Sequence, residues 1–220
     1  MVKIDLITGF LGSGKTTFIK KYAKYLMAHG MNIGILENDF GAVNVDMMLL
    51  KDLEGDQCEL EMVAGGCDAD CHRRRFKTKL IAMGMCGYDR VIVEPSGIFD
   101  VDEFFDVLRE EPLDQWYEIG SVITIMNAKL EDTLSEEAEY LLASEAANAG
   151  CVVLSRSQDA SPEEIAKTRA HLNCALQAVY CSRQFGDEII EKNWEDFTEQ
   201  DLERIQNSGY HVEDYTKLHF

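Results

Sequence analysis

Short apolar runs alternate along the chain with longer segments whose apolar residues recur every three or four positions. The runs predict buried strands, and the spaced segments predict amphipathic helices. The expected strands cover residues 2–7, 32–36, 57–63, 89–93, 121–126, 151–154 and 178–180. The expected helices cover residues 18–26, 71–83, 101–110 and 135–148, and a further one begins after Ser161. Strands that alternate with helices imply an α/β fold with three layers, in which a mostly parallel sheet carries helices on both faces.

The loop between the first strand and the first helix reads Gly9-Phe10-Leu11-Gly12-Ser13-Gly14-Lys15-Thr16-Thr17. It fits G-x-x-x-x-G-K-[ST], the phosphate-binding P-loop, and a strand before it and a helix after it are the context this motif needs. Glycines let the backbone wrap around phosphates, and the helix N-terminus directs N–H groups at the anion. We expect Lys15 to reach the β- and γ-phosphates and Thr16 to bind Mg²⁺. The alternative is a glycine-rich turn without a ligand, which the flanking elements disfavour.

Acidic residues follow two of the expected strands, at the edge of a parallel sheet where ligands bind. Glu37 and Asp39 follow the second strand, and Glu94 and Gly97 follow the fourth. We expect Glu37 and Glu94 to hold Mg²⁺ or its waters and Asp39 to align the attacking water, with Gly97 as a γ-phosphate sensor. The alternative is that these carboxylates are ordinary solvated side chains at strand ends.

The charge and the cysteines narrow the class of protein. The 220 residues carry a formal net charge of −19, which argues against a nucleic-acid partner. The first residues do not resemble a signal peptide, and we find no apolar run long enough to span a membrane. We therefore expect a cytoplasmic protein whose seven cysteines are reduced and serve packing or metal binding rather than disulfides.

Several short motifs occur in a fixed order: GFLGSGKTT, ENDFG, GGC, EPSG and then a hydrophobic strand that ends in a polar tetrad. This set resembles the CobW/HypB/UreG family of P-loop GTPases, and most closely its CobW-like metallochaperone branch. The resemblance covers about residues 2–182. It implies a P-loop NTPase fold and a GTP-hydrolysing switch that helps load a metal, such as zinc, cobalt or nickel, into a client protein. It also implies a nucleotide-dependent homodimer. We expect a single nucleotide-binding domain with an acidic, partly helical tail over residues 183–220.

The cysteine motif departs from the family pattern. CobW-like proteins carry Cys-x-Cys-Cys after the glycines, whereas this chain has Cys67-Asp68-Ala69-Asp70-Cys71 followed by His72. Two thiolates and an imidazole suit Zn²⁺, with Asp68 or Asp70 as an oxygen ligand. Neighbouring residues at a helix start point in different directions, so not all of these groups converge. The alternative is two thiols that bind no metal. We expect the other five cysteines to be packing residues: Cys58, Cys86, Cys151, Cys174 and Cys181.

The polar tetrad departs from the family pattern as well. The guanine-reading sequence Asn/Ser-Lys-x-Asp is replaced by Ser155-Arg156-Ser157-Gln158. An aspartate at the fourth position accepts two hydrogen bonds from guanine, while the neutral amide of Gln158 offers both a donor and an acceptor. We expect Ser155, Arg156 and Gln158 to contact the base, which can be guanine or adenine.

The motifs together predict a P-loop nucleoside triphosphatase whose partners are a nucleoside triphosphate with Mg²⁺, Zn²⁺ or another transition metal, and a client metalloprotein. Neither nucleic acid nor a membrane is an expected partner. A small-molecule kinase is the first alternative, because it uses the same loop, but it needs arginines near the phosphates. Arg73-Arg74-Arg75 is the one basic cluster, and a solvated helix face is the favoured interpretation of it. The second alternative is a module that binds nucleotide or metal without catalysis.

Overall fold

The computed structural model describes residues 1–10, 12–39, 45–65, 68–95, 101–131 and 133–211. The chain forms two compact units. The first comprises Met1–Ile7 with Lys15–Gly120, and the second comprises Thr8–Gly14 with Ser121–Phe220. The P-loop sequence is thereby divided, because Gly14 belongs to the second unit and Lys15 to the first.

The strands of the first unit are β1 (Val2–Thr8), β2 (Ile33–Asp39), β3 (Cys58–Ala64) and β4 (Arg90–Pro95), in the order β3-β2-β4-β1. Every pairing among them is parallel. β4 is buried along its whole length, as expected for a parallel strand that is covered on both faces.

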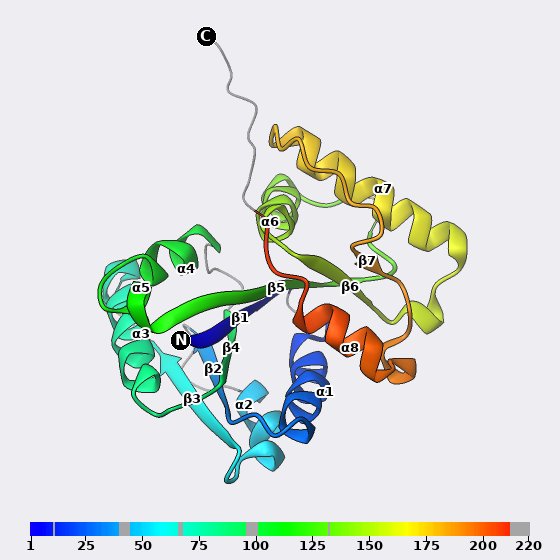
Figure 1. Ribbon diagram of the computed structural model, residues 1–220. Helices are drawn as coiled ribbons and strands as arrows, with labels where there is room; N and C mark the ends of the chain where they lie inside the picture. The colour runs from blue at the N-terminus through cyan, green and yellow to red at the C-terminus, as the bar shows by residue number, and fades with distance from the viewer. Residues whose placement is uncertain (11, 40–44, 66–67, 96–100, 132, 212–220) are drawn as a thin grey trace. The chain divides into compact units, whose positions relative to one another are not determined.

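Helices cover both faces of these strands (Figure 1). One face carries α1 (Lys15–Ala28), α2 (Val45–Leu50) and the 3₁₀ turn η1 (Lys51–Leu53), which contact one another. The other face carries α3 (Ala69–Gly84), α4 (Val101–Leu108) and α5 (Leu113–Trp116). α1 buries Phe18, Tyr22 and Leu26 completely, and these are three of the apolar positions whose spacing predicts the helix.

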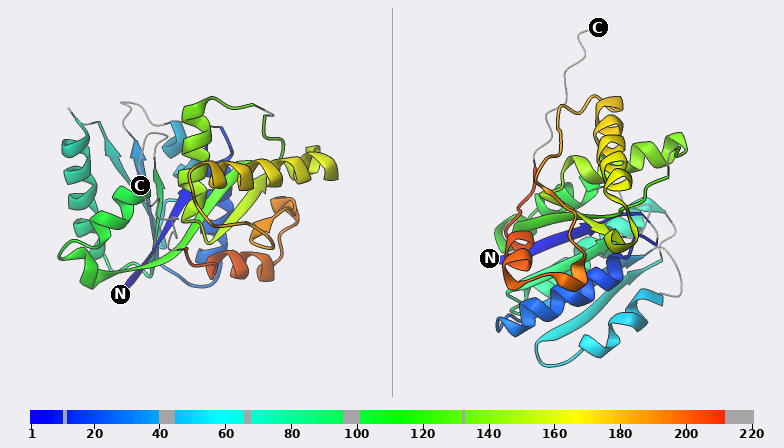
Figure 2. Two further views of the ribbon diagram at one scale, coloured as in Figure 1. Left: turned by 90° about the horizontal axis from the view of Figure 1, so that it is seen from above. Right: turned by 90° about the vertical axis from the view of Figure 1, so that its right-hand side faces the viewer.

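The second unit has the same layered construction. Its strands β5 (Tyr117–Asn127, which begins in the first unit), β6 (Cys151–Ser155) and β7 (Ile189–Ile190) pair in parallel and in this order. α6 (Glu136–Ala147) and α7 (Pro162–Ala178) pack together on one face, and α8 (Glu199–Gln206) lies on the other (Figures 1 and 2). The expected architecture, a mostly parallel sheet with helices on both faces, is confirmed in each unit.

The helix-start signals of the sequence are seen in the structure, but the last expected strand is wrong. Ser161 caps α7 in a complete capping box with Glu164, and Pro162 takes the first helical position. α7 then continues through Ala178, because Leu172, Ala175 and Leu176 are buried at helical spacing. The apolar run at 178–180 therefore ends a helix, and the final strand is Ile189–Ile190. α2 and α5 are too short to show a helical period, and we did not predict them.

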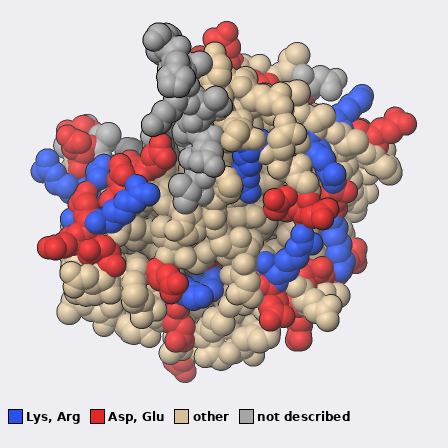
Figure 3. All heavy atoms as spheres, turned by 45° about the horizontal axis from the view of Figure 1, so that its top comes forward, with Lys and Arg blue, Asp and Glu red and all other residues tan. Residues whose placement is uncertain are grey.

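No helix within the described ranges is long and apolar enough to cross a membrane. On the face drawn in Figure 3, acidic and basic side chains are interspersed rather than separated.

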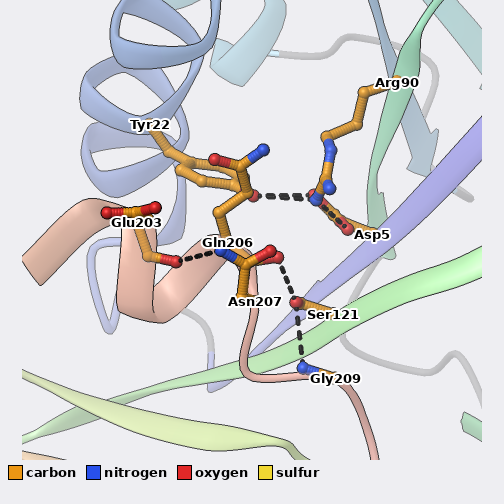
Figure 4. Close-up of polar contacts among 8 residues, drawn as sticks. All are labelled: Asp5, Tyr22, Arg90, Ser121, Glu203, Gln206, Asn207 and Gly209. Carbon is orange, nitrogen blue, oxygen red and sulfur yellow. Dashed lines mark hydrogen bonds and ion pairs between the residues drawn. The ribbon is translucent and has the colours of Figure 1, made fainter. Parts of the chain in front are cut away.

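A buried polar network joins β1, α1 and β4 in the first unit (Figure 4). Arg90 donates from Nη1 to both Asp5 carboxylate oxygens, at 2.8 and 2.6 Å, and the Tyr22 hydroxyl donates to Asp5 Oδ2 at 2.9 Å. Asp5 is fully buried, so removing a donor would leave a buried charge less well compensated. In the second unit, Ser121 Oγ donates to the Gln206 carbonyl and accepts from Gly209 N–H, which ties the end of α8 to β5 (Figure 4).

Because of the buried Tyr22 hydroxyl, the free energy of unfolding should fall as the pH rises into the alkaline range. Burial, and after it the negative charge of Asp5, raises the pKa of Tyr22 well above its ordinary value of 10.0. The stabilisation that the neutral Tyr22 hydroxyl provides is complete below the unfolded-state pKa near 10. It is lost as the pH rises toward the folded-state pKa. Tyr22→Phe should cost about 1–3 kcal/mol at pH 7, and its deficit relative to wild type should shrink above about pH 10. Urea unfolding from pH 7 to 11 measures this, with exposed Tyr140→Phe as the control. A deficit that stays constant up to pH 11 would contradict it.

Candidate functional site

The glycine loop adopts a backbone conformation that residues with a side chain rarely take. Gly9, Gly12 and Gly14 all have positive φ, of 136°, 76° and 98°. A Cβ atom at Gly9 would lie 2.1 Å from the Ile125 carbonyl oxygen, so the loop can approach β5 this closely only with glycine. Ser13 N–H closes the turn on the Phe10 carbonyl at 3.0 Å. These contacts lie within the second unit and give the first half of the P-loop its shape.

The second half of the P-loop meets β4 within the first unit. Lys15 and Thr16 open α1, where backbone N–H groups face outward at the positive end of the helix dipole. Lys15 Nζ lies 3.9 Å from Glu94 Oε1, and Thr16 Oγ1 donates to Glu94 Oε2 at 3.5 Å. The exposed fraction of Lys15 is only 8%, so this lysine is a buried, paired charge, although the motif alone gives no sign of burial.

A second carboxylate stands beside Glu94. Glu37 on β2 is in register with Glu94 on β4, and both side chains are buried. Their oxygens, with the Thr16 hydroxyl, form the hard donor set that Mg²⁺ prefers, so the residues present fit the ion that the P-loop implies. The side chain of Asp39 and the whole of Gly97 lie outside the part of the chain that is described. Gly12 and Thr17 are exposed, and Ser13 is buried.

The tetrad begins at Ser155, the last residue of β6, and continues into a tight turn in the second unit. Arg156 is left-handed, with φ of 54°, and the 3₁₀ turn η2 (Ser157–Asp159) follows it. Strain of this kind in a non-glycine residue is concentrated at functional sites. Ser155 and Ser157 are buried, and neither hydroxyl has a hydrogen-bond partner among the described residues. The same holds for the Ser13 hydroxyl of the P-loop. Buried hydroxyls without partners are rare, and each calls for an explanation such as a bound water, an ion or a functional role.

Two residues near the tetrad were not recognised in the sequence. The Gln158 amide is exposed and lies 3.5 Å from the carboxylate of Asp159, which therefore adds an acid directly after the tetrad. Trp194 lies against Gly14 of the P-loop, at the end of the chain segment that follows β7. Asp159 could have been noticed as a shifted tetrad acid, whereas no sequence signal connects Trp194 with the loop.

Asp68 and His72 of the cysteine motif both form hydrogen bonds within the first unit. Asp68 caps α3 and accepts from Cys71 N–H at 2.7 Å. His72 is 1% exposed, with Nδ1 at 3.1 Å from the Gly65 carbonyl and Nε2 at 2.7 Å from Asn38 Oδ1. Because both ring nitrogens are engaged, we take His72 out of the zinc ligand set. Cys67 lies outside the described residues, and no cluster of three or more metal-binding side chains is found within them.

The arginine cluster contributes to ion pairs on the surface of α3. Arg73 pairs with Glu110 at 2.7 Å, and Lys77 pairs with the same carboxylate at 2.5 Å. The hydrogen bond from Lys77, and after it the one from Arg73, lowers the pKa of Glu110. This agrees with a solvated, ion-paired helix face.

The five cysteines outside the motif differ in burial. Cys58, Cys151 and Cys181 are buried as expected. The expectation is wrong for Cys86 and Cys174, which are exposed because they lie beyond the end of α3 and on the outer side of α7.

Comparison with solved structures supports the fold. A LAO/AO transport system kinase covers 86% of this chain and 52% of its own, at 18% identity and a TM-score of 0.52. FlhF complexed with GMPPNP and Mg²⁺ covers 86% of this chain and 64% of its own, at 16% identity and a TM-score of 0.54. The three-layer α/β fold and the glycine loop define a P-loop nucleotide-binding protein.

Within this class the chain belongs to the CobW/HypB/UreG family, whose nucleotide-binding domain matches residues 3–180. The zinc chaperone YeiR of Escherichia coli (strain K12) is 29% identical over 167 residues, which are 74% of this chain and 49% of YeiR. The zinc chaperone YjiA of the same organism is 30% identical over 138 residues, 58% of this chain and 41% of YjiA. The zinc-regulated GTPase metalloprotein activator 1 of Schizosaccharomyces pombe is 22% identical over 200 residues, 86% of this chain and 48% of that protein. The chain thus spans about half the length of these relatives.

Proposed function

We propose that this chain is a nucleoside triphosphatase of the zinc-chaperone kind, a GTP-hydrolysing switch whose nucleotide state governs zinc binding and delivery to a client protein. The observation that carries the proposal is the meeting of Lys15, Thr16 and Glu94 at the start of α1. These are the cation, hydroxyl and carboxylate that phosphoryl transfer to water requires. The names of YeiR and YjiA, both zinc chaperones, support zinc as the cargo.

Each residue has a proposed part in hydrolysis. The backbone of Gly9, Gly12, Ser13 and Gly14 binds the phosphates together with Thr17, and Lys15 exchanges Glu94 for the β- and γ-phosphate oxygens. Thr16, Glu37 and Glu94 would hold Mg²⁺, which would supply positive charge to neutralise the phosphates. Asp39 orients the attacking water, and Gly97 contacts the γ-phosphate. Catalysis then rests on positioning and electrostatics rather than on a covalent step.

Zinc is the proposed cargo, held by the Cys67 and Cys71 thiolates with a carboxylate such as Asp70 as a further ligand. Asp68 fixes the backbone of Cys71 through its cap, which presents this thiol in a defined position. A site with few protein ligands suits a protein that must release its metal to a client. We place this activity in the cytoplasm, where thiols stay reduced, and propose that the active form is a nucleotide-dependent homodimer.

Hydrolysis and metal assays separate this proposal from its alternatives. We expect the purified chain to release phosphate from GTP with Mg²⁺ in water alone, and its zinc retention against a chromogenic chelator to differ between GDP and a non-hydrolysable GTP analogue. Turnover that needs an added acceptor would indicate a small-molecule kinase. Nucleotide binding without turnover, with or without zinc, would indicate a non-catalytic module.

The neutral side chain of Gln158 should weaken discrimination between bases. We expect the wild-type protein to bind both GTP and ATP. Gln158→Asp should raise the preference for GTP by about tenfold, within the ~1–3 kcal/mol range of one bidentate base contact. The new carboxylate accepts both guanine N–H groups, which adenine does not offer. Calorimetric titration with each nucleotide measures the ratio, and Gln158→Asn controls for altered size without charge. Complete exclusion of ATP by wild type would contradict this reasoning.

A further inference from the structure

The indole of Trp194 touches the P-loop within the second unit. A Cβ atom at Gly14 would lie 2.8 Å from Trp194 Cη2, 3.5 Å from Trp194 Cζ2 and 3.8 Å from Ser155 Cβ. The six-membered ring of the indole is therefore in contact with Gly14, beside the first residue of the tetrad. The positive φ of 98° favours glycine at position 14, and a larger residue there would displace the indole.

The chain after β7 holds Trp194 in this place. β7 pairs with β6 through Val152↔Ile189 and Val153↔Ile190, so the tetrad and the Trp194 segment both follow the carboxyl ends of neighbouring parallel strands. Trp194 opens the 3₁₀ turn η3 (Trp194–Asp196), whose end is closed by Phe197 N–H on the Trp194 carbonyl at 3.2 Å.

An ion pair anchors the same segment to α8. Lys192 Nζ lies 2.6 Å from Asp201 Oδ2. The hydrogen bond from Lys192 is the largest of the interactions that lower the pKa of Asp201 to about 2. Asp201 also accepts from the Thr198 backbone N–H in the capping box of α8. The segment that carries the Trp194 indole is therefore held in place by α8.

We propose that Trp194 is a base-binding residue, a platform on which the purine base of the bound triphosphate stacks. This inference rests on the proposed nucleotide function. In that function the P-loop binds the phosphates and the tetrad reads the edge of the base. The indole that lies against Gly14, near Ser155 of the tetrad, then offers an aromatic surface on which any purine can stack. Because the edge-reading position is the neutral Gln158, stacking supplies a larger share of base affinity here than in a chain with aspartate at that position.

Calorimetry with three ligands tests the platform: GTP, ATP and inorganic tripolyphosphate, each with Mg²⁺. Trp194→Ala should weaken GTP and ATP by about tenfold or more, the scale of one stacked base, and leave tripolyphosphate within about twofold. Trp194→Phe should keep most of the affinity. The chain has two tryptophans, so in a Trp116→Phe background the fluorescence of Trp194 alone should be quenched by GTP and unaffected by tripolyphosphate.

Three results would decide against the platform or its basis. Equal losses for tripolyphosphate and GTP in a folded Trp194→Ala protein would mean that Trp194 merely supports the P-loop. Unchanged GTP and ATP affinity in Trp194→Ala would mean that it does not touch the base. Failure of wild type and Trp116→Phe to bind either nucleotide would instead overturn the proposed nucleotide function itself.

Discussion

Replacing Lys15 with alanine should lower the rate of triphosphate hydrolysis by about a hundredfold or more, the loss that follows removal of one preorganised charge-stabilising donor. The lysine is the cation at the start of α1, and its ammonium lies 3.9 Å from Glu94 Oε1. Without it, negative charge on the transferred phosphoryl group loses its main protein counterion. Single-turnover phosphate release and nucleotide titration measure the effect on chemistry and on binding separately.

The burial of Lys15 requires a check on folding, because the alanine variant leaves Glu94 facing a smaller, uncharged neighbour. Lys15→Arg retains the cation and should bind nucleotide more tightly than Lys15→Ala while hydrolysing slowly, since the guanidinium has a different shape. Lys20→Ala is the matched control on the same helix, where the lysine pairs with Asp52 at 2.7 Å in a partly exposed position. Normal hydrolysis by a folded Lys15→Ala protein would overturn the proposed function.

Replacing Cys67 and Cys71 together with serine should lower zinc affinity by orders of magnitude and leave nucleotide affinity unaltered. A serine hydroxyl is a far weaker zinc ligand than a thiolate. The single variants should each lose part of the affinity. Competition with a chromogenic chelator measures the zinc constant, and nucleotide titration of the same samples shows that the P-loop is intact.

Cys86→Ser is the matched control, because this thiol is exposed and lies just after the same helix α3. His72→Gln adds a second control that follows from the structure. His72 is held by Gly65 and Asn38, so its loss should reduce stability while zinc is still bound by the two thiolates. Stoichiometric zinc in the cysteine double variant would remove the site and leave a nucleotide hydrolase without a metal function.

The sequence by itself determined the features that depend on short stretches of chain. Apolar spacing gave the strands and long helices, and Ser161-Pro162 with Glu164 gave the start of α7. The P-loop could be recognised because its glycines meet a local need, positive φ at Gly9, Gly12 and Gly14. The family was recognisable for the same reason, since its motifs are short and ordered. Short elements such as α2, α5 and β7 were missed or misplaced, because they contain too few residues to show a period.

Tertiary structure alone decided which residues share a site. Thr16 meets Glu94 across 78 positions, and His72 meets Asn38 across 34. The same packing buries Lys15, takes up both nitrogens of His72 and sets Trp194 against Gly14. A histidine beside a cysteine looks like a metal ligand in sequence, but its ring is committed elsewhere once β2 and α3 are packed. The physical reason is range: propensity, capping and φ act within a few residues, whereas burial and partner choice depend on segments brought together by the folded sheet.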